Sequence, residues 1–257
     1  MRLRLKITNK SNLPQAVFEW ILKTQGEYTK GDADISVTEL INPPRIRILR
    51  KKHYDEIETD AEGLLNVTVG NCIHDGIETA TKTGIAERRL DVTIRGWKLS
   101  GGMDHYHEGT LTDYKTANKW KTVLSDDGRI EEWEKQLNVY AYILKCNGHP
   151  VSDLQIWAYF KDWNRGEFGQ YSKKGQIFRP NLSCGYPEKE WLTIPIELWS
   201  PEKTRAYVEE RVRLHQEAET NLPECPREAL WGGRRCRDYC DVNKWCLQYQ
   251  STLKEKQ

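Results

Sequence analysis

The sequence lacks the features that would place the protein in a membrane or in an oxidising compartment. Its longest apolar run is about Val139–Leu144, far short of the roughly 20 residues of a membrane-spanning helix. No apolar segment typical of a secretory signal follows Met1. The seven cysteines are an odd number, so clustered cysteines are interpreted first as metal ligands rather than disulfides. We therefore expect a cytoplasmic protein without a membrane partner.

An excess of charge of one sign is also lacking. The chain has 39 Lys and Arg against 38 Asp and Glu, for a net charge of +1. Nucleic acid would therefore have to be bound by a local patch rather than by an overall field. There is no G-x-x-x-x-G-K-[ST] motif, so no motor is expected. What the chain does have is 257 residues with 10 Trp and 12 Tyr, which is typical of a folded globular protein.

Hydrophobic patterns predict an α/β fold. Ser36 and Glu39 have capping-box spacing, so a helix is expected to begin at Ser36. A second helix is expected at about residues 64–81, with Val69 on its buried face. The clearest helix spans residues 130–145, where apolar residues recur with a 3.6-residue period. Alternation predicts strands that include residues 1–10, 90–94, 110–115 and 154–160. Residues 163–190 are interpreted as a loop.

Two carboxylates and a lysine fall where a hairpin would bring them together. Asp113 and Lys115 are two residues apart on a predicted strand and share a face, and Asp104 precedes the turn into that strand. Converging carboxylates favour a divalent cation such as Mg²⁺ or Mn²⁺. Lys115 could then position water or stabilise charge on a phosphate. A D-x-K triplet alone is more often an exposed ion pair.

Four further side chains could belong to the same site. His74, on a predicted helix, could complete a His, Asp, Asp metal site, although a lone helical histidine is more often structural. Glu87 opens the next strand and could be an additional ligand. Gln136 and Tyr140 lie one turn apart on the helix at 130–145. Core packing is the default role of Tyr140, whereas Gln136 could reach a phosphate or a base.

Four short motifs occur in order along the chain: GNCIH at 70–74, GGMD at 101–104, TDYKT at 112–116 and QLNVY at 136–140. This series resembles the RecB-type branch of the PD-(D/E)XK nuclease superfamily, which shows G-x-x-x-H, G-x-x-D, D-x-K and Q-x-x-x-Y. The resemblance covers residues 36–145 and the cysteine-rich tail. It implies a restriction-endonuclease-like fold, in which a mixed sheet is flanked by helices, with a small C-terminal four-cysteine module.

The resemblance also implies residue roles. The catalytic Mg²⁺ or Mn²⁺ would be bound by His74, Asp104 and Asp113, with Glu87 as a further candidate. Lys115 would assist catalysis. Gln136 and Tyr140 would belong to an active-site helix that faces DNA.

The C-terminal part of the chain contains four cysteines within 22 residues, namely Cys225, Cys236, Cys240 and Cys246. Such a set suits zinc or an iron–sulfur cluster. Iron–sulfur members of the resembled family bind a [4Fe–4S] cluster with three C-terminal cysteines and one that precedes the core, often in a C-P-R segment. Here that segment reads Pro43-Pro44-Arg45, so Cys225, or else Cys72, would be the fourth ligand. We expect a [4Fe–4S] cluster, with structural Zn²⁺ as the alternative.

These observations predict a nuclease domain at residues 1–221, with its core at 36–165 and a cysteine-rich appendage at 222–250. The expected function is that of a metal-dependent DNA nuclease, an exonuclease acting on single strands or DNA ends. Recombination, repair, phage replication and CRISPR adaptation would all use such an enzyme, with a helicase or recombination protein as a partner. The alternative is a catalytically silent DNA-binding or scaffold subunit of a helicase–nuclease complex.

Overall fold

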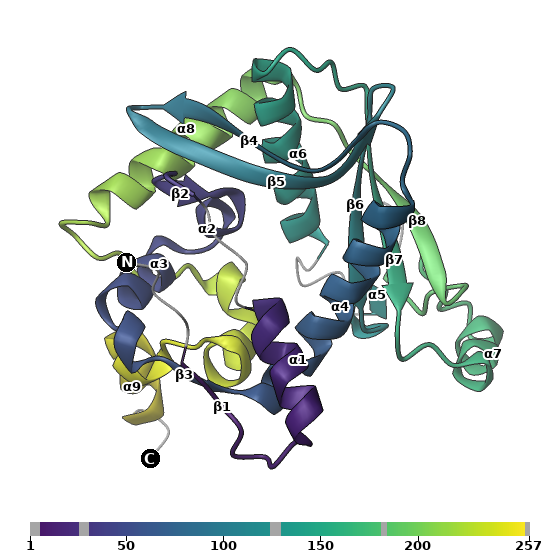
Figure 1. Ribbon diagram of the computed structural model, residues 1–257, viewed down its shortest axis with the longest axis horizontal. Coiled ribbons are helices and arrows are strands. Elements are labelled where there is room, and N and C mark those ends of the chain that lie inside the picture. Colours follow the sequence, from purple (N-terminus) through teal and green to yellow (C-terminus); the bar gives the residue numbers. More distant parts are fainter. Residues whose placement is uncertain (1–5, 26–30, 124–129, 181–183, 255–257) are drawn as a thin grey trace. The chain divides into compact units, whose positions relative to one another are not determined.

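The computed structural model describes residues 6–25, 31–123, 130–180 and 184–254 (Figure 1). The chain divides into two compact units. Unit 1 comprises residues 1–31, 42–72 and 211–257, and unit 2 comprises residues 32–41 and 73–210. Two of the four unit boundaries, at residues 72/73 and 210/211, fall inside helices α4 (Ala61–Ala80) and α8 (Pro201–Glu217). The predicted domain limit at residue 222 stays a prediction.

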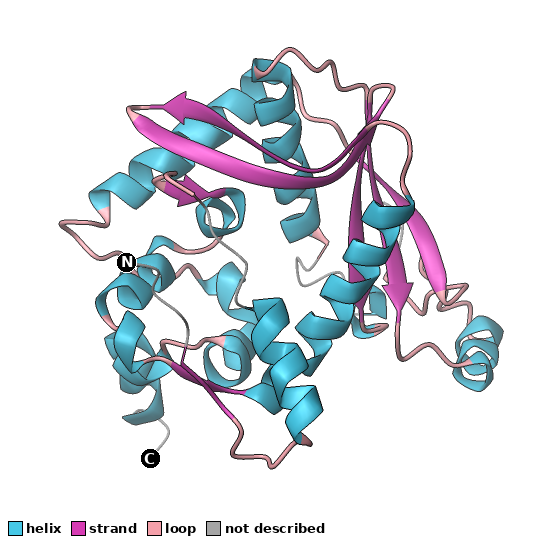
Figure 2. Cartoon of the chain, in the orientation of Figure 1, coloured by secondary structure: helices cyan, strands magenta, loops and turns pink. Residues whose placement is uncertain are grey.

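Unit 2 is built on a six-stranded mixed sheet (Figure 2). Its strands are β2 (Ile35–Ser36), β4 (Ile85–Ile94), β5 (Trp97–His107), β6 (Thr110–Ala117), β7 (Asp153–Phe160) and β8 (Trp191–Ile196). The pairs β2–β5 and β6–β7 are parallel, whereas β4–β5, β5–β6 and β7–β8 are antiparallel. The mixed sheet flanked by helices that the sequence predicted is therefore confirmed.

Two tight turns join β4, β5 and β6. Arg95 and Gly96 connect the first pair, and Glu108 and Gly109 connect the second. All four residues have positive φ, at 50°, 80°, 46° and 87° respectively. Two consecutive residues of positive φ are the requirement of a type I′ turn, whose twist matches that of the flanking strands. These turns set the register that places the acidic residues of the three strands opposite one another.

Helix α6 (Glu131–Cys146) covers one face of this sheet and packs against β4, β5, β6 and β7. Its buried side chains follow the predicted stripe and include Leu137, Ile143 and Leu144. They meet the buried face of β7, on which Ile156 and Phe160 are fully buried. The predicted helix at 130–145 is confirmed.

The predicted capping box is also confirmed, at helix α2 (Val37–Ile41). The Ser36 backbone N donates to Glu39 Oε2 at 2.9 Å, and the Glu39 backbone N donates to Ser36 Oγ at 3.2 Å. The remaining helices of unit 2 are α5 (Trp120–Val123) and α7 (Arg165–Lys173).

Unit 1 contains less regular structure. It holds α1 (Gln15–Gln25), α3 (Pro44–Lys52) and α9 (Leu247–Lys254), and a parallel pair formed by β1 (Lys6–Thr8) and β3 (Glu58–Asp60). Short 3-10 helices span Tyr54–Glu56, Arg227–Gly233 and Asn243–Trp245, and a π-helical turn spans Arg235–Tyr239. Its core cluster consists of Ile46, Leu49, Ile57, Cys225, Val242 and Cys246.

Two local predictions differ from the structure. Val69 is 42% exposed rather than buried, because the buried position of this part of α4 is Thr68, one residue earlier. The segment 163–190, predicted as a loop, contains α7, whose N-terminus is capped by Asn164 Oδ1 accepting from the Glu167 backbone N. Of the predicted strand at residues 1–10, residues 1–5 lie outside the described residues.

Within the described ranges, no helix combines the length and the apolar character needed to cross a bilayer.

Candidate functional site

Glu87 and Asp104 lie opposite each other in the hairpin of β4 and β5. Their positions are directly opposed in the antiparallel register. Glu87 has a φ of 45°, in the left-handed region that side-chain-bearing residues adopt rarely and at a cost in energy. The pairing of the two strands is interrupted at this one position, where Glu87 departs from the regular pleat.

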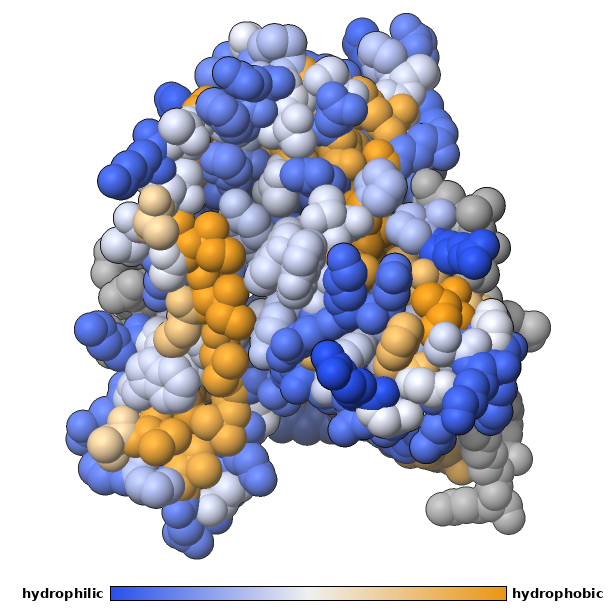
Figure 3. All heavy atoms as spheres, turned by 90° about the vertical axis from the view of Figure 1, so that its right-hand side faces the viewer, coloured by the Kyte–Doolittle hydropathy of each residue, from blue (hydrophilic) through white to orange (hydrophobic). Residues whose placement is uncertain are grey.

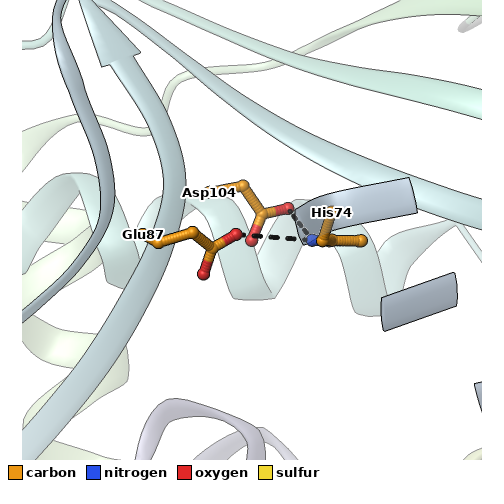
Figure 4. Close-up of side chains that lie close together, drawn as sticks. All are labelled: His74, Glu87 and Asp104. Carbon is orange, nitrogen blue, oxygen red and sulfur yellow. Dashed lines mark ion pairs between the residues drawn. The ribbon is translucent and has the colours of Figure 1, made fainter. Parts of the chain in front are cut away.

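His74 of α4 joins these two carboxylates (Figure 4). Its Nδ1 lies 3.5 Å from Asp104 Oδ2 and 3.6 Å from Glu87 Oε1. One ligand atom from each of the three residues lies within 4.8 Å of the other two. An imidazole nitrogen with two carboxylate oxygens is a donor set that suits a divalent cation such as Mn²⁺ or Mg²⁺. Glu87, which the sequence predicts only as a further candidate ligand, is thus one of the three residues of this donor set.

The charge at His74 is consistent with a cation site. Burial lowers the pKa of His74, but its contacts with Asp104 and Glu87 outweigh burial and raise this pKa to about 10. At neutral pH the free protein therefore places a positive imidazolium between two carboxylates. A divalent cation that displaces the His74 proton could supply this positive charge between the two carboxylates instead. The residues present fit such a cation in both donor type and charge.

Asp113 and Lys115 lie on β6 beside this cluster. Asp113 is 2% exposed, and its Oδ2 lies 2.5 Å from Lys115 Nζ. That buried oxygen accepts no hydrogen bond of ordinary geometry from any described residue. Burial raises the pKa of Asp113, the Lys115 ammonium lowers it and Asp104 raises it, with a net rise to about 6. The Lys115 ammonium is the positive charge that faces this buried oxygen in the free protein.

Asp113 is not one of the three residues of the 4.8 Å donor set, within the part of the chain that the structure describes. It is close enough to that set for its pKa to respond to Asp104 and His74. Its predicted role as a metal ligand stays a prediction, as does the role of Lys115.

Asp104 is fixed in place by β6. Its Oδ2 accepts a hydrogen bond of 2.6 Å from the backbone N of Tyr114. This bond crosses the point where the regular pairing of β5 and β6 has ended at His105 and Thr112. A hydrogen bond from a group that is not itself a ligand fixes the orientation of a ligand carboxylate and limits its rotation.

Gln136 and Tyr140 lie on α6 and contact each other. Gln136 Nε2 donates to the Tyr140 hydroxyl at 3.0 Å. Tyr140 is 6% exposed, and a Cβ placed on Gly101 of β5 would lie 2.7 Å from its ring. Gly101 therefore gives the tyrosine ring room to pack on the strand that carries Asp104. The G-G-x-D and Q-x-x-x-Y motifs of this chain therefore pack against each other at Gly101 and Tyr140. Their predicted contact with DNA stays a prediction.

A basic segment follows β6. Lys119 Nζ pairs with Glu167, and its backbone N donates to Asp162 Oδ1 at 2.7 Å. Lys121 Nζ lies 4.9 Å from the centroid of the Trp133 ring. Both lysines thus make contacts within unit 2, whereas Trp120 between them is 45% exposed.

The four C-terminal cysteines line one cavity of unit 1, together with apolar residues of α3. Cys225 and Cys246 are buried, and Cys236 and Cys240 are half-buried. Gln248 fixes Cys225 with two hydrogen bonds, accepting from its backbone N at 2.8 Å and donating to its carbonyl O at 2.9 Å. Cys72, the other candidate for the fourth position, is exposed. The structure therefore places Cys225, rather than Cys72, with the C-terminal trio.

Arg45 of α3 reaches the same cavity and was not singled out as a site residue. It is 9% exposed, and its guanidinium donates to the carbonyl oxygens of Pro223 at 2.7 Å and Leu222 at 3.3 Å. Its Nη1 lies 4.0 Å from Cys246 Sγ. Among the described side chains no carboxylate forms an ion pair with Arg45. A buried cation without an anionic partner is costly. Burial raises the pKa of the Cys225 thiol to about 12, so the cysteines would supply negative charge to Arg45 only as thiolates bound to a metal.

Comparisons with known proteins relate the chain to others through its fold. No protein-family model matches the sequence. No curated protein matches it either. The structure is similar to the crystal structure of SSO0001, with a TM-score of 0.56 and 14% identity over 91% of this chain and 95% of that one. At this identity the similarity shows a shared fold alone.

A crystal structure of a phage related exonuclease from Haemophilus somnus 129PT is more distant. Its TM-score is 0.33 and its identity 11%, over 84% of this chain and 92% of that chain. This similarity is too low for any conclusion about the present chain.

Proposed function

We propose that this protein is a metal-dependent DNA nuclease of the RecB-type PD-(D/E)XK family. The observation that carries the proposal is that residues from three of the four motifs, together with Glu87, meet at one place in unit 2. The metal-type donor set of His74, Glu87 and Asp104 adjoins the buried pair of Asp113 and Lys115. A hairpin, a strand and a helix contribute to this site, which unites the oxygen donors, the imidazole and the lysine that phosphodiester hydrolysis requires.

Each residue has a distinct role in this proposal. Mg²⁺ or Mn²⁺, when bound, supplies a Lewis acid that polarises the phosphate and lowers the pKa of water. His74, Glu87 and Asp104 would hold the ion, and Asp113 would offer a further carboxylate oxygen. Lys115 neutralises Asp113 in the free protein, and in the reaction it would stabilise the negative charge that develops on the phosphate.

The substrate is proposed to be DNA, attacked at ends or along single strands. This finer assignment follows from the family resemblance. It includes a helicase or recombination protein as a possible partner, because the sequence has no motor of its own.

The cysteine cavity is proposed to hold a [4Fe–4S] cluster with a structural role. Four cysteines suit either a cluster of several irons or a single zinc ion. The family resemblance supports the cluster, with Zn²⁺ as the alternative. The buried charge of Arg45 supports an anionic centre of either kind.

Cleavage of end-labelled linear DNA tests the enzymatic proposal. Single- and double-stranded substrates are incubated with the full chain in Mg²⁺ or Mn²⁺, alongside Lys115→Ala. The expected loss is at least about 100-fold, because a charge-stabilising group at the phosphate is removed. Lys135→Ala is the matched control, since Lys135 forms an exposed ion pair with Glu131 one turn earlier on α6.

The outcomes separate the hypotheses. Cleavage by the wild type and by Lys135→Ala, but not by Lys115→Ala, would support the nuclease, and the product ladder would give its polarity. Folded protein that binds DNA and cleaves nothing in either metal would contradict the enzyme. It would favour the silent DNA-binding or scaffold subunit.

A further inference from the structure

A row of aromatic side chains crosses one face of the sheet in unit 2. Trp157 and Tyr159 of β7 are half-buried and alternate with fully buried neighbours. Their ring centroids are 6.5 Å apart and the rings are within 13° of parallel. Tyr114 of β6 is the register partner of Trp157, with the ring centroids 6.2 Å apart. Trp191 of β8 is the register partner of Tyr159. The four rings thus extend over three adjacent strands.

One end of the row is the candidate active site. The His74 ring lies edge-on to Tyr114, with centroids 6.0 Å apart, and the Tyr114 backbone N holds Asp104. The other end is β8, the last strand in the sheet order. The row therefore joins the proposed metal site to the edge of the sheet.

The outer end of the row is accessible and carries a cation. Trp191 is 47% exposed, and Lys189 Nζ lies 5.5 Å from its ring centroid. Figure 3 turns toward the viewer the right-hand side of Figure 1, where β8 is drawn, and shows hydrophilic, intermediate and hydrophobic side chains on that face.

The chemistry of the row suits nucleobases. Successive bases of a single strand stack on aromatic side chains, because every base has a flat π-face, while nearby cations contact the phosphates. In a duplex those faces are covered by neighbouring base pairs. We propose that Tyr114, Trp157, Tyr159 and Trp191 form a track that binds a single strand of nucleic acid and leads it to the His74–Asp104 site. The direction of the track rests on the proposed nuclease function, whereas its binding activity does not.

Binding in the absence of metal tests the track. Fluorescence anisotropy is measured in EDTA with labelled oligo-dT of about 20 nucleotides and with a duplex of equal length. Trp191→Ala is expected to weaken oligo-dT binding about tenfold, the effect of losing one stacked base, and to leave duplex binding unchanged. Trp120→Ala is the matched control, because Trp120 is 45% exposed and lies 5.8 Å from Lys119 Nζ but is outside the row.

Several results would overturn the track. These are no binding of oligo-dT by the wild type, equal losses for Trp191→Ala and Trp120→Ala, or a loss that is the same for duplex and single strand. Trp191→Phe should restore most of the affinity, because it keeps a ring. Protein that shows the expected binding pattern but cleaves nothing with Mg²⁺ or Mn²⁺ would contradict the nuclease and leave the track intact.

Discussion

The two clusters of candidate ligands, one in each unit, differ in the chemistry of their donor atoms and in the backbone structure that carries them. The His74–Glu87–Asp104 site offers nitrogen and oxygen donors whose side chains remain 25%, 33% and 12% exposed. The cysteine cavity offers sulfur donors beside apolar residues such as Ile46 and Leu49. Hard donors open to solvent suit an ion that exchanges and meets substrate, whereas buried soft donors suit a permanent centre.

The backbone structure around the two sites also differs. The carboxylates of unit 2 lie on hydrogen-bonded strands that hold their register without a metal. Cys236 lies on a π-helical turn, a geometry that often marks function, and the other three cysteines lie on loops. The first site is therefore positioned by the fold, whereas the proposed centre at the cysteines would help to position the chain around it. Three substitutions test this difference.

The largest effect on stability is expected at the thiol cavity. Cys225→Ser should lose most of the bound metal and lower the free energy of unfolding by on the order of 5 kcal/mol, because a structural metal contributes roughly 10 kcal/mol or more to folding. Elemental analysis and chemical denaturation measure the two quantities. Cys184→Ser, which changes an exposed thiol, should leave both within error. Retained metal and stability in Cys225→Ser would show that Cys225 is not a ligand.

A smaller effect is expected where the sheet meets α6. In Gly101→Ala the new Cβ would lie 2.7 Å from Tyr140 ring atoms and 3.0 Å from Val37 Cγ2. The expected loss of unfolding free energy is about 1–3 kcal/mol, as for other overpacked cores. Gly102→Ala is its control, because the nearest atom to that Cβ is an Arg89 side-chain nitrogen at 3.5 Å. Equal denaturation midpoints for the two variants would contradict the close packing of Tyr140 on β5.

The smallest effect concerns charge near the thiols. Arg45→Gln should release bound metal to a chelator about tenfold faster, equivalent to about 1.4 kcal/mol. Arg50→Gln is the control on the same helix, since Arg50 is already paired with Asp241 at 2.7 Å.

Arg45→Lys distinguishes charge from packing at this position. It keeps the charge but loses the forked hydrogen bonds to Leu222 and Pro223. Release as slow as that of the wild type would assign the effect to charge. Release as fast as that of Arg45→Gln would assign it to the hydrogen bonds.

Local patterns were sufficient to predict several elements. The Ser36–Glu39 capping box and the helix at 130–145 depend on side chains three to four residues apart, and both are confirmed. The helix α7 was missed because residues 163–190 lack a strong apolar period. Its start depends on one polar cap, Asn164.

Other features depend on distant parts of the chain. Arg45 is separated by 177 and 178 residues from the carbonyl groups that it contacts, so no local pattern reveals its burial. The place of Glu87 in the donor set with His74 and Asp104 requires a left-handed backbone at Glu87 and its position opposite Asp104 on the neighbouring strand. The aromatic row requires the order of β6, β7 and β8, which alternation alone does not give.

The left-handed conformation of Glu87 has a consequence for how such a protein can change. A residue with a side chain held at positive φ costs the fold on the order of 1–3 kcal/mol, and glycine at that place would relieve the cost. Selection for heat resistance alone would therefore favour losing this carboxylate. Its retention would require selection for what the site does, so position 87 is where thermal robustness and chemistry are in direct conflict.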